Sequence, residues 1–199
     1  YTIGRIVLFK DDTLARKRPE WAVHRPDGSI WTNDNGVAWV DPYRREVWDY
    51  NLAIASRAAA AGFDEIQLDY IRFPSDGKIS LCRYSNPDHT PKAASANLMD
   101  FLAQAKARLR AFGVKISICV FGMTTSTQGD MGIGQRITVL TREVDAVSPM
   151  MYPSHYNKGE MGIPHPNRDP YQTIHRGLRD AVERLGGDAE RDEKRRWND

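Results

Sequence analysis

The sequence has 199 residues, of which 41% are hydrophobic and 27% are charged. This composition is typical of a globular chain with a sizeable core, and it excludes a largely disordered or low-complexity protein. With 28 basic and 26 acidic residues the charge is balanced, and no apolar run approaches the roughly 18 residues that span a bilayer. We therefore expect no nucleic-acid partner and no membrane insertion.

The first third of the chain predicts a strand, a hairpin and a helix. The apolar, β-branched residues over 3–9 are typical of a buried strand, and a Pro-Asp-Gly turn predicts a small hairpin over 21–31. Asp41 followed by Pro42 resembles a helix N-cap with proline at the first helical position, and Gly62 provides the stop of that helix.

The remaining chain continues to alternate strands with helices. The expected elements are strands over 65–70, 114–121 and 146–152, and helices over 90–113, 133–144 and 169–186. Repeated strand–helix–strand units predict an α/β protein with parallel strands, arranged either as a barrel or as an open doubly wound sheet. No Gly-rich dinucleotide fingerprint opens any of these helices.

The strand over 65–70 has one polar face. Glu65, Gln67 and Asp69 alternate with Ile66 and Leu68, so the two sets lie on opposite sides of the strand. A polar face on a central parallel strand is costly unless it lines a site. If the strands form a barrel, we expect the three polar side chains to face the barrel interior and the two apolar ones to face the helices.

Asp69 falls at the carboxyl end of this strand, where α/β barrels carry their chemistry, and Arg72 follows three residues later. A carboxyl group beside an arginine stays ionised at neutral pH, which suits a nucleophile or a stabiliser of positive charge. A structural ion pair between Asp69 and Arg72 explains the same spacing equally well.

The run GFDEIQLDYIRFP over 62–74 resembles the signature of the glycoside hydrolase-like domain family DUF4015, and more distantly that of the DUF187 glycosidase-like family. Four further runs are similar to the same domain: 5–11, 120–122, 130–135 and 148–156. Together they span most of 1–186. The resemblance implies a (β/α)8 TIM-barrel fold and an activity on polysaccharide.

The chain is short for such a barrel, because complete barrels take about 250 residues. Only about four of the eight barrel strands are evident in the sequence. We therefore expect an incomplete barrel or a fragment: a barrel-like domain over 1–187 whose N-terminal strands are missing, followed by a charged tail over 188–199.

One position departs from the family pattern. Where related sequences usually carry an aspartate before Val-Phe-Gly, this chain has Cys119. Glycosidases use two carboxyl groups that flank the scissile bond. Asp130, in a Gly-rich loop, is the second catalytic candidate beside Asp69, although a role in the turn is equally open. Asp11 is a further carboxylate at a strand end, and Asp41 is favoured as a helix cap only.

Side chains that bind the sugar are expected at the other strand ends. Tyr152, His155 and Tyr156 follow the last predicted strand, and aromatic faces stack on pyranose rings. A loop hydrogen bond is favoured for His155 over a role as general acid. The expected substrate-binding set is Lys10, Asp11, Gln67, Arg72, Tyr152, His155 and Tyr156.

These features favour a glycoside hydrolase acting on a bacterial-type polysaccharide or oligosaccharide, with Asp69 as nucleophile or stabiliser. Cys119 favours an alternative, a non-catalytic carbohydrate-binding barrel. A metal-dependent deacetylase would need a ligand set, but His155, His165 and His175 lie on different predicted elements and no HExxH motif occurs. We expect no metal and no cofactor. The substrate class alone favours an extracellular or cell-envelope location.

Overall fold

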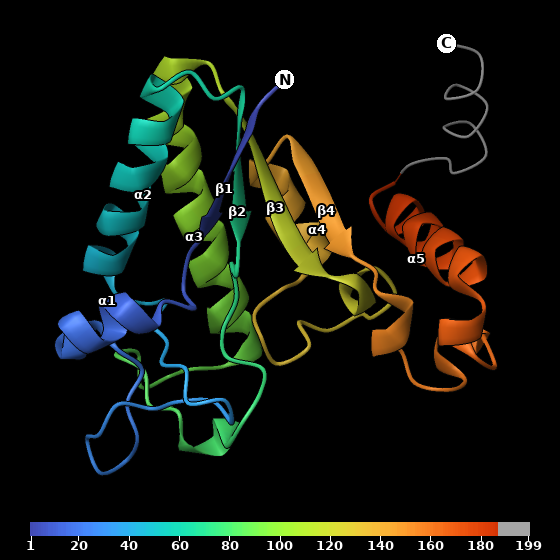
Figure 1. The fold of residues 1–199 in the computed structure, drawn as a ribbon, viewed down its shortest axis with the longest axis horizontal. Helices are drawn as coiled ribbons and strands as arrows, with labels where there is room; N and C mark the ends of the chain where they lie inside the picture. Colours follow the sequence, from blue (N-terminus) through green and yellow to red (C-terminus); the bar gives the residue numbers. More distant parts are fainter. Residues whose placement is uncertain (187–199) are drawn as a thin grey trace.

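The computed structural model describes residues 1–186, so the predicted tail over 188–199 lies outside the described residues (Figure 1). Within this range a four-stranded sheet has the order β1-β2-β3-β4, and each neighbouring pair is parallel. The strands are β1 (Ile3–Val7), β2 (Glu65–Asp69), β3 (Lys115–Phe121) and β4 (Ala146–Met150). The predicted α/β class and the four strands are confirmed. Spatial order equals sequence order, as it does around a barrel and not in a doubly wound sheet.

Two long helices cover one face of the sheet. α2 (Arg45–Ala60) and α3 (Pro91–Leu109) lie side by side in Figure 1, and the ring of Phe101 from α3 packs edge-on against Phe9 and Trp48, each with 5.5 Å between ring centroids. These rings belong to the main hydrophobic core between the helices and the strands.

The remaining helices are α1 (Asp12–Lys17), α4 (Ile137–Leu140) and α5 (Pro170–Arg184). Within the described range no helix is both long and apolar enough to cross a membrane.

The predicted starts of α3 and α5 are confirmed by their caps. Thr90 Oγ1 accepts a hydrogen bond from the backbone N–H of Ala93 at 3.2 Å, and Asp169 Oδ1 accepts one from Gln172 at 3.2 Å. A proline follows each cap, where the missing N–H costs nothing.

The predicted start of α2 is wrong, because Asp41 does not cap this helix. α2 begins at Arg45, and the buried Asp41 carboxylate accepts hydrogen bonds from the backbone N–H groups of Tyr43 (3.0 Å) and Ser85 (2.6 Å). Asp41 thus joins two loops that lie far apart in the sequence, which is a tertiary role that no local pattern reveals.

The helix expected over 133–144 is much shorter in the structure. Only Ile137–Leu140 is α-helical, and a 3₁₀ turn over Thr141–Glu143 follows. Gly134 has φ = +80°, in the left-handed region, so the backbone there cannot belong to an α-helix. Its Cα also packs closely, since a Cβ would lie 2.9 Å from Leu98 Cδ1.

The hairpin expected over 21–31 is present only as isolated bridges, including one between His24 and Ile30. Its turn forms as predicted: Gly28 has φ = +82°, and the N–H of Arg25 donates to the carbonyl of Ser29 at 2.7 Å.

The two faces of β2 differ as the alternation predicts. Ile66 and Leu68 are fully buried in the core beneath the helices. On the opposite face, Ser117 Oγ donates to Glu65, and Gln67 Nε2 lies 3.4 Å from Ser148 Oγ. The polar face of β2 therefore continues across β3 and β4 as a row of hydrogen-bonding side chains.

Candidate functional site

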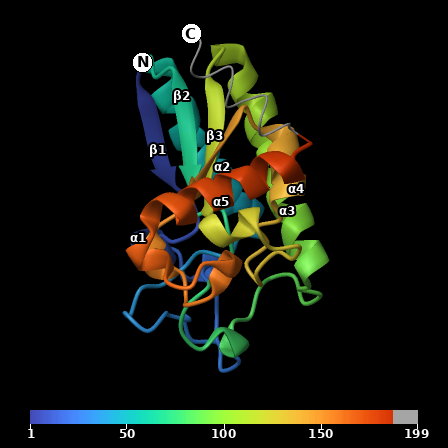
Figure 2. The same ribbon diagram turned by 90° about the vertical axis from the view of Figure 1, so that its right-hand side faces the viewer.

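A cavity of about 670 Å³ opens at the carboxyl ends of the strands. In Figure 2 the arrowheads point toward the end of the molecule that carries the long loops, which is also where barrel enzymes place their sites. The cavity is lined by the end of β2, the loop after β3, and the segment that follows β4. Five of the predicted site residues line it together: Asp69, Arg72, Tyr152, His155 and Tyr156.

The Asp69 carboxylate accepts two hydrogen bonds at the carboxyl end of β2. Its Oδ2 accepts a hydrogen bond from Arg5 Nη2, and its Oδ1 accepts one from the backbone N–H of Tyr70 at 2.7 Å. Only 1% of the Asp69 side chain is exposed, whereas 57% of the Arg5 side chain is. This hydrogen bond and the charge of Asp69 raise the pKa of the Arg5 guanidinium.

The sequence spacing suggested that Arg72 would pair with Asp69, but Arg5 takes that place. The register sets Arg5 on β1 opposite Gln67, on the same face of the sheet as Asp69. Arg72 lies beyond a sharp turn in the backbone, because Tyr70 has φ = +51°. A left-handed non-glycine residue costs on the order of 1–3 kcal/mol, and such strain is concentrated at functional sites.

Arg72 is a buried cation surrounded by aromatic rings. Only 5% of the residue is exposed, and burial lowers the pKa of its guanidinium. The guanidinium carbon lies close to three ring centroids: Trp39 at 4.9 Å, Tyr70 at 4.9 Å and Phe121 at 4.5 Å. Cation–π attraction therefore holds this charge at the wall of the cavity.

Tyr156 contributes a buried hydroxyl to the cavity. This hydroxyl has no hydrogen-bond partner among the described residues, and burial followed by the charge of Glu160 raises its pKa. It lies against Gly122, where an added Cβ would collide with it and come within 2.8 Å of the Met150 carbonyl oxygen. Gly122 is thus required for Tyr156 to approach the end of β3.

Tyr152 and His155 form an exposed aromatic surface at the same cavity. Their ring centroids are 5.1 Å apart, and 53% of Tyr152 is exposed. Exposed rings of this kind can stack on the C–H faces of a sugar.

Glu160 is a second carboxylate in the cavity, and the sequence did not point to it. Its oxygens accept hydrogen bonds from the backbone N–H of Asn157 at 2.8 Å and from Asn157 Nδ2 at 2.9 Å. Arg5 was also missed, since β1 carried no recognisable motif around it. The register of β1 against β2 brings Arg5 to Asp69, and the path of the loop after β4 brings Glu160 into the same cavity. A single sequence shows neither the register nor the loop path.

Four of the expected site residues do not line this cavity. The Asp11 carboxylate caps α1 by accepting from the N–H of Leu14 at 2.8 Å. Asp130 accepts from the N–H groups of Gly132 (3.1 Å) and Gly134 (3.0 Å), so it organises its own loop.

Gln67 lies deeper along β2 than Asp69, on the same polar face. The Lys10 ammonium lies 5.1 Å from the ring centroid of Tyr70, which lines the cavity, but Lys10 itself does not line it.

Cys119 lies on β3, on the strand next to Asp69, and is buried as a free thiol. Burial, followed by the negative charge of Asp69, raises the pKa of this thiol. The thiol is therefore protonated at neutral pH and is no substitute for a carboxylate. Within residues 1–186, no group of three or more His, Cys, Asp or Glu side chains converges so as to hold a metal ion.

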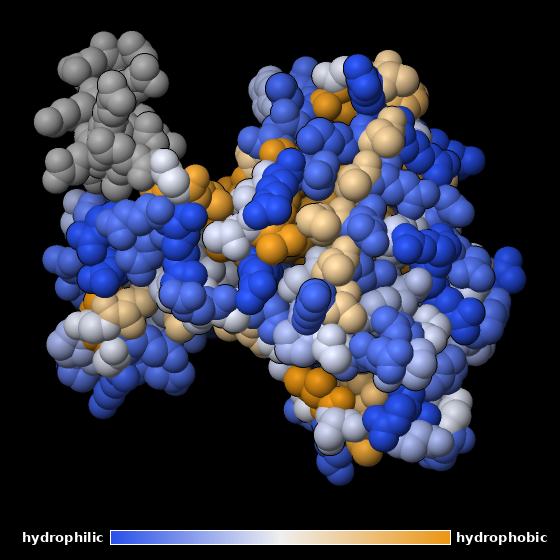
Figure 3. Space-filling model, turned by 180° about the vertical axis from the view of Figure 1, so that it is seen from behind, coloured by the Kyte–Doolittle hydropathy of each residue, from blue (hydrophilic) through white to orange (hydrophobic). Residues whose placement is uncertain are grey.

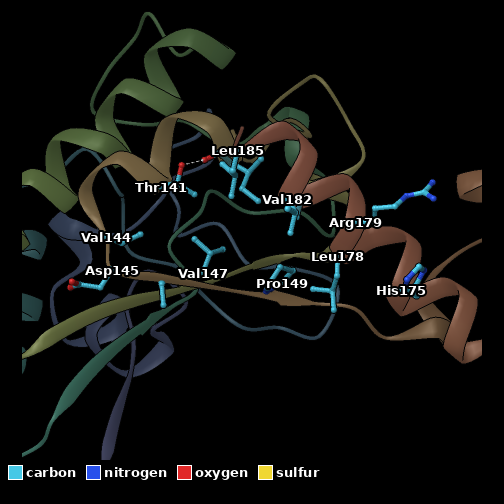
Figure 4. Close-up of a pocket in the computed structure, with 13 residues that line it drawn as sticks. Thr141, Val144, Asp145, Val147, Pro149, His175, Leu178, Arg179, Val182 and Leu185 are labelled. Carbon is cyan, nitrogen blue, oxygen red and sulfur yellow. Dashed lines mark hydrogen bonds between the residues drawn. The ribbon is translucent and has the colours of Figure 1, made fainter. Parts of the chain in front are cut away.

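A second cavity, of about 420 Å³, lies between β4 and α5 and differs in character. Figure 4 shows Val147 and Pro149 from β4 facing Leu178 and Val182 from α5 and Leu185 just after this helix. Seen from behind, hydrophobic surface gathers in the hollow between α5 and the main body (Figure 3). This groove is mainly apolar and lies on the helix side of the sheet, away from the polar row of side chains that crosses β2, β3 and β4.

A carboxylate and an arginine thus lie at the ends of parallel strands beside exposed aromatic rings, at the end of the strands where barrel enzymes place their sites. The sequence over residues 1–197 matches DUF4015, described as "Putative glycosyl hydrolase domain". The chain belongs to this family. No match was found among curated proteins.

Solved structures share the fold. The PgaB (BpsB) glycoside hydrolase domain of Bordetella bronchiseptica is 12% identical, with a TM-score of 0.58 over 90% of this chain and 58% of that one. An α-galactosidase of Thermus thermophilus is 18% identical, with a TM-score of 0.51 over 92% of this chain and 34% of that one.

A hypothetical protein of Ruminiclostridium thermocellum is 38% identical, with a TM-score of 0.52, over 58% of this chain and 56% of that one. The chain thus spans only about half the length of this relative, and the fold is that of part of a TIM barrel of the glycosidase type.

Proposed function

We propose that the protein hydrolyses a glycosidic bond of a bacterial-type polysaccharide in the cavity at the strand ends. The observation that carries this proposal is Asp69: a buried carboxylate at the end of a central parallel strand, next to the strained Tyr70, in a cavity with exposed aromatic rings. Membership of a glycosyl hydrolase domain family supports it.

Asp69 acts on the positive charge that develops at the anomeric carbon. The transition state of glycoside hydrolysis resembles an oxocarbenium ion, which a fixed carboxylate stabilises or attacks. In the free protein Arg5 neutralises Asp69, but its exposed side chain can leave when a sugar enters. Arg5 is therefore a positioning residue that covers the carboxylate between turnovers.

Glu160 provides the second carboxyl group. It shares the cavity with Asp69, whereas Asp11 and Asp130 are engaged in capping their own segments. As general acid it would protonate the leaving-group oxygen, which is the step that an alkyl or sugar leaving group requires.

Glu160→Gln is expected to lower kcat on the polymer by roughly 10²- to 10⁴-fold, the usual contribution of a general acid. An aryl glycoside of the same sugar should be affected much less, because nitrophenolate leaves without a proton. The measurement is kcat on both substrates, with Glu183→Gln on α5 as the control, whose side chain is 60% exposed and remote from the cavity. Equal losses on both substrates, or none, would exclude Glu160 as the acid.

A second candidate function is carbohydrate binding without turnover, and Cys119 favours it. A neutral thiol lies next to Asp69, at the position where the resemblance to the family implies an aspartate. On this interpretation the chain retains the aromatic cavity but lacks a catalytic carboxylate.

Cys119→Asp distinguishes the two functions. If Glu160 already provides the second carboxyl group, wild type hydrolyses the polymer and Cys119→Asp adds nothing, because the pair of carboxyl groups is already complete. If the chain only binds sugar, wild type is inactive and Cys119→Asp gains hydrolysis that the matched Cys119→Ser variant lacks. We expect the first outcome, measured as reducing ends released per folded molecule.

A further inference from the structure

We propose that Arg72 forms an anion-binding subsite of the cavity, and that the sugar bound there carries a carboxylate, as a uronic acid does. That the ligand is a sugar of a polysaccharide rests on the proposed function. The negative charge on the sugar is inferred from the arrangement around Arg72 alone.

The charge of Arg72 is not neutralised by a contacting acid. Buried arginines are normally paired with a carboxylate. Among residues 1–186, however, Arg72 forms no ion pair within 4.0 Å, whereas Arg5 occupies the carboxylate of Asp69. Asp76, the other nearby acid, accepts a hydrogen bond from Asn33 Nδ2 at 2.6 Å. The cavity wall therefore carries an unpaired, largely dehydrated positive charge.

The free donors of Arg72 have the geometry that a carboxylate needs. Nη1 donates to the carbonyl of Phe73 at 3.1 Å and to Ser75 Oγ at 2.9 Å, and both acceptors are neutral. No described residue accepts from Nε or Nη2, and neither atom is among the buried polar atoms without a partner. These two donors therefore reach the cavity surface, on the edge of the guanidinium that binds carboxylates with two parallel hydrogen bonds.

The surroundings fix this edge in place. Trp39, Tyr70 and Phe121 hold the guanidinium by their rings, so little side-chain freedom is lost when a ligand binds. The Lys10 ammonium also lies against the ring of Tyr70, 5.1 Å from its centroid, and adds a second positive charge nearby. A dehydrated cation gains much more from an anion than from a neutral hydroxyl, so this wall selects an acidic sugar.

The test compares charged sugars with neutral esters of the same shape. D-Glucuronate and D-galacturonate are titrated into the full chain, alongside their methyl esters and acetate, and binding is followed by NMR at the backbone amides and the arginine Nε–H groups. We expect each acid to bind roughly 10- to 100-fold more tightly than its ester, with the Arg72 Nε–H resonance shifting. Acetate should bind more weakly than either acid, because it lacks the sugar ring.

Variants then assign the preference to Arg72. Arg72→Gln should remove the preference for acid over ester, and Arg72→Lys should retain part of it, because the charge remains without the two-pronged donor. Arg108→Gln on α3, an arginine with 39% side-chain exposure far from the cavity, is the control and should change nothing. If Arg72→Gln does not fold, the Nε–H resonance of wild type still reports the contact.

Three results would overturn the subsite: equal binding of acid and ester, no binding of either acid, or a preference that survives in Arg72→Gln. Acetate binding as tightly as the uronates would also contradict it, because the sugar ring would then contribute nothing to binding. None of these readouts requires hydrolysis. A uronate preference without turnover would therefore refute the proposed hydrolase but leave the subsite standing, and turnover of a polymer together with equal binding of acid and ester would do the reverse.

Discussion

Asp69→Asn is expected to reduce turnover by about 100-fold or more while leaving the fold intact. The amide has the shape of the carboxylate, and its Oδ1 can still accept the hydrogen bond from the Tyr70 N–H. The lost charge is the one that would stabilise the oxocarbenium-like centre. Arg5 is left without its partner, but because its side chain is mostly in solvent this should cost no more than about 1 kcal/mol. Turnover and the free energy of unfolding in urea measure the two effects separately.

Asp49→Asn is the matched control for this substitution. Asp49 forms an ion pair with Arg108 at 3.3 Å, and its side chain is 67% exposed, far from the cavity. It should change neither turnover nor stability appreciably. A purely structural Asp69 would produce the opposite pattern: an Asp69→Asn protein that unfolds much more easily yet hydrolyses normally per folded molecule.

Phe101→Ala is expected to lower the free energy of unfolding by about 3–5 kcal/mol. The ring is fully buried between Phe9 and Trp48, so its removal leaves a cavity between α3, α2 and the sheet. Because this interface holds β2 against its helices, the variant should also weaken binding at the strand ends. Urea unfolding followed by tryptophan fluorescence measures the loss.

Phe112→Ala provides the comparison, since the same atoms are removed from a residue that is 42% exposed just after α3. We expect a loss below about 1 kcal/mol. Similar losses for the two variants would mean that the packing of α3 on the sheet does not dominate the stability of this fold.

The sequence predicted the elements whose signals are local. The alternation over 65–69 identified β2 and its two faces, because a strand repeats every two residues. The starts of α3 and α5 followed from Thr90 and Asp169, because a cap bonds to a backbone group only three residues away.

Features that depend on distant residues were not predictable in this way. Asp41 looked like a cap, but its carboxylate accepts from the N–H of Ser85, 44 residues away, and α2 begins only at Arg45. The partner of Asp69 is Arg5 on the neighbouring strand, and the choice follows from register and not from the spacing to Arg72. Glu160 lies in an irregular loop that reaches the cavity. Such a loop has no repeating pattern of apolar residues from which its path could be predicted.

The proposed catalytic carboxylates and the proposed anion-binding arginine line the same cavity. Asp69 and Glu160 would provide the two carboxyl groups, and Arg72 would hold an acidic sugar against the aromatic wall. The apolar groove between β4 and α5 has no part in this chemistry.

The measurement that tests this account most directly is a crystal structure of the Asp69→Asn protein with an uncleaved oligosaccharide of the best-hydrolysed polymer. The account predicts a sugar chain in the cavity at the strand ends, with its scissile bond between residues 69 and 160 and a carboxylate at Arg72. An oligosaccharide bound in the groove beside Leu178, or in the cavity with no anomeric carbon near residue 69, would contradict it.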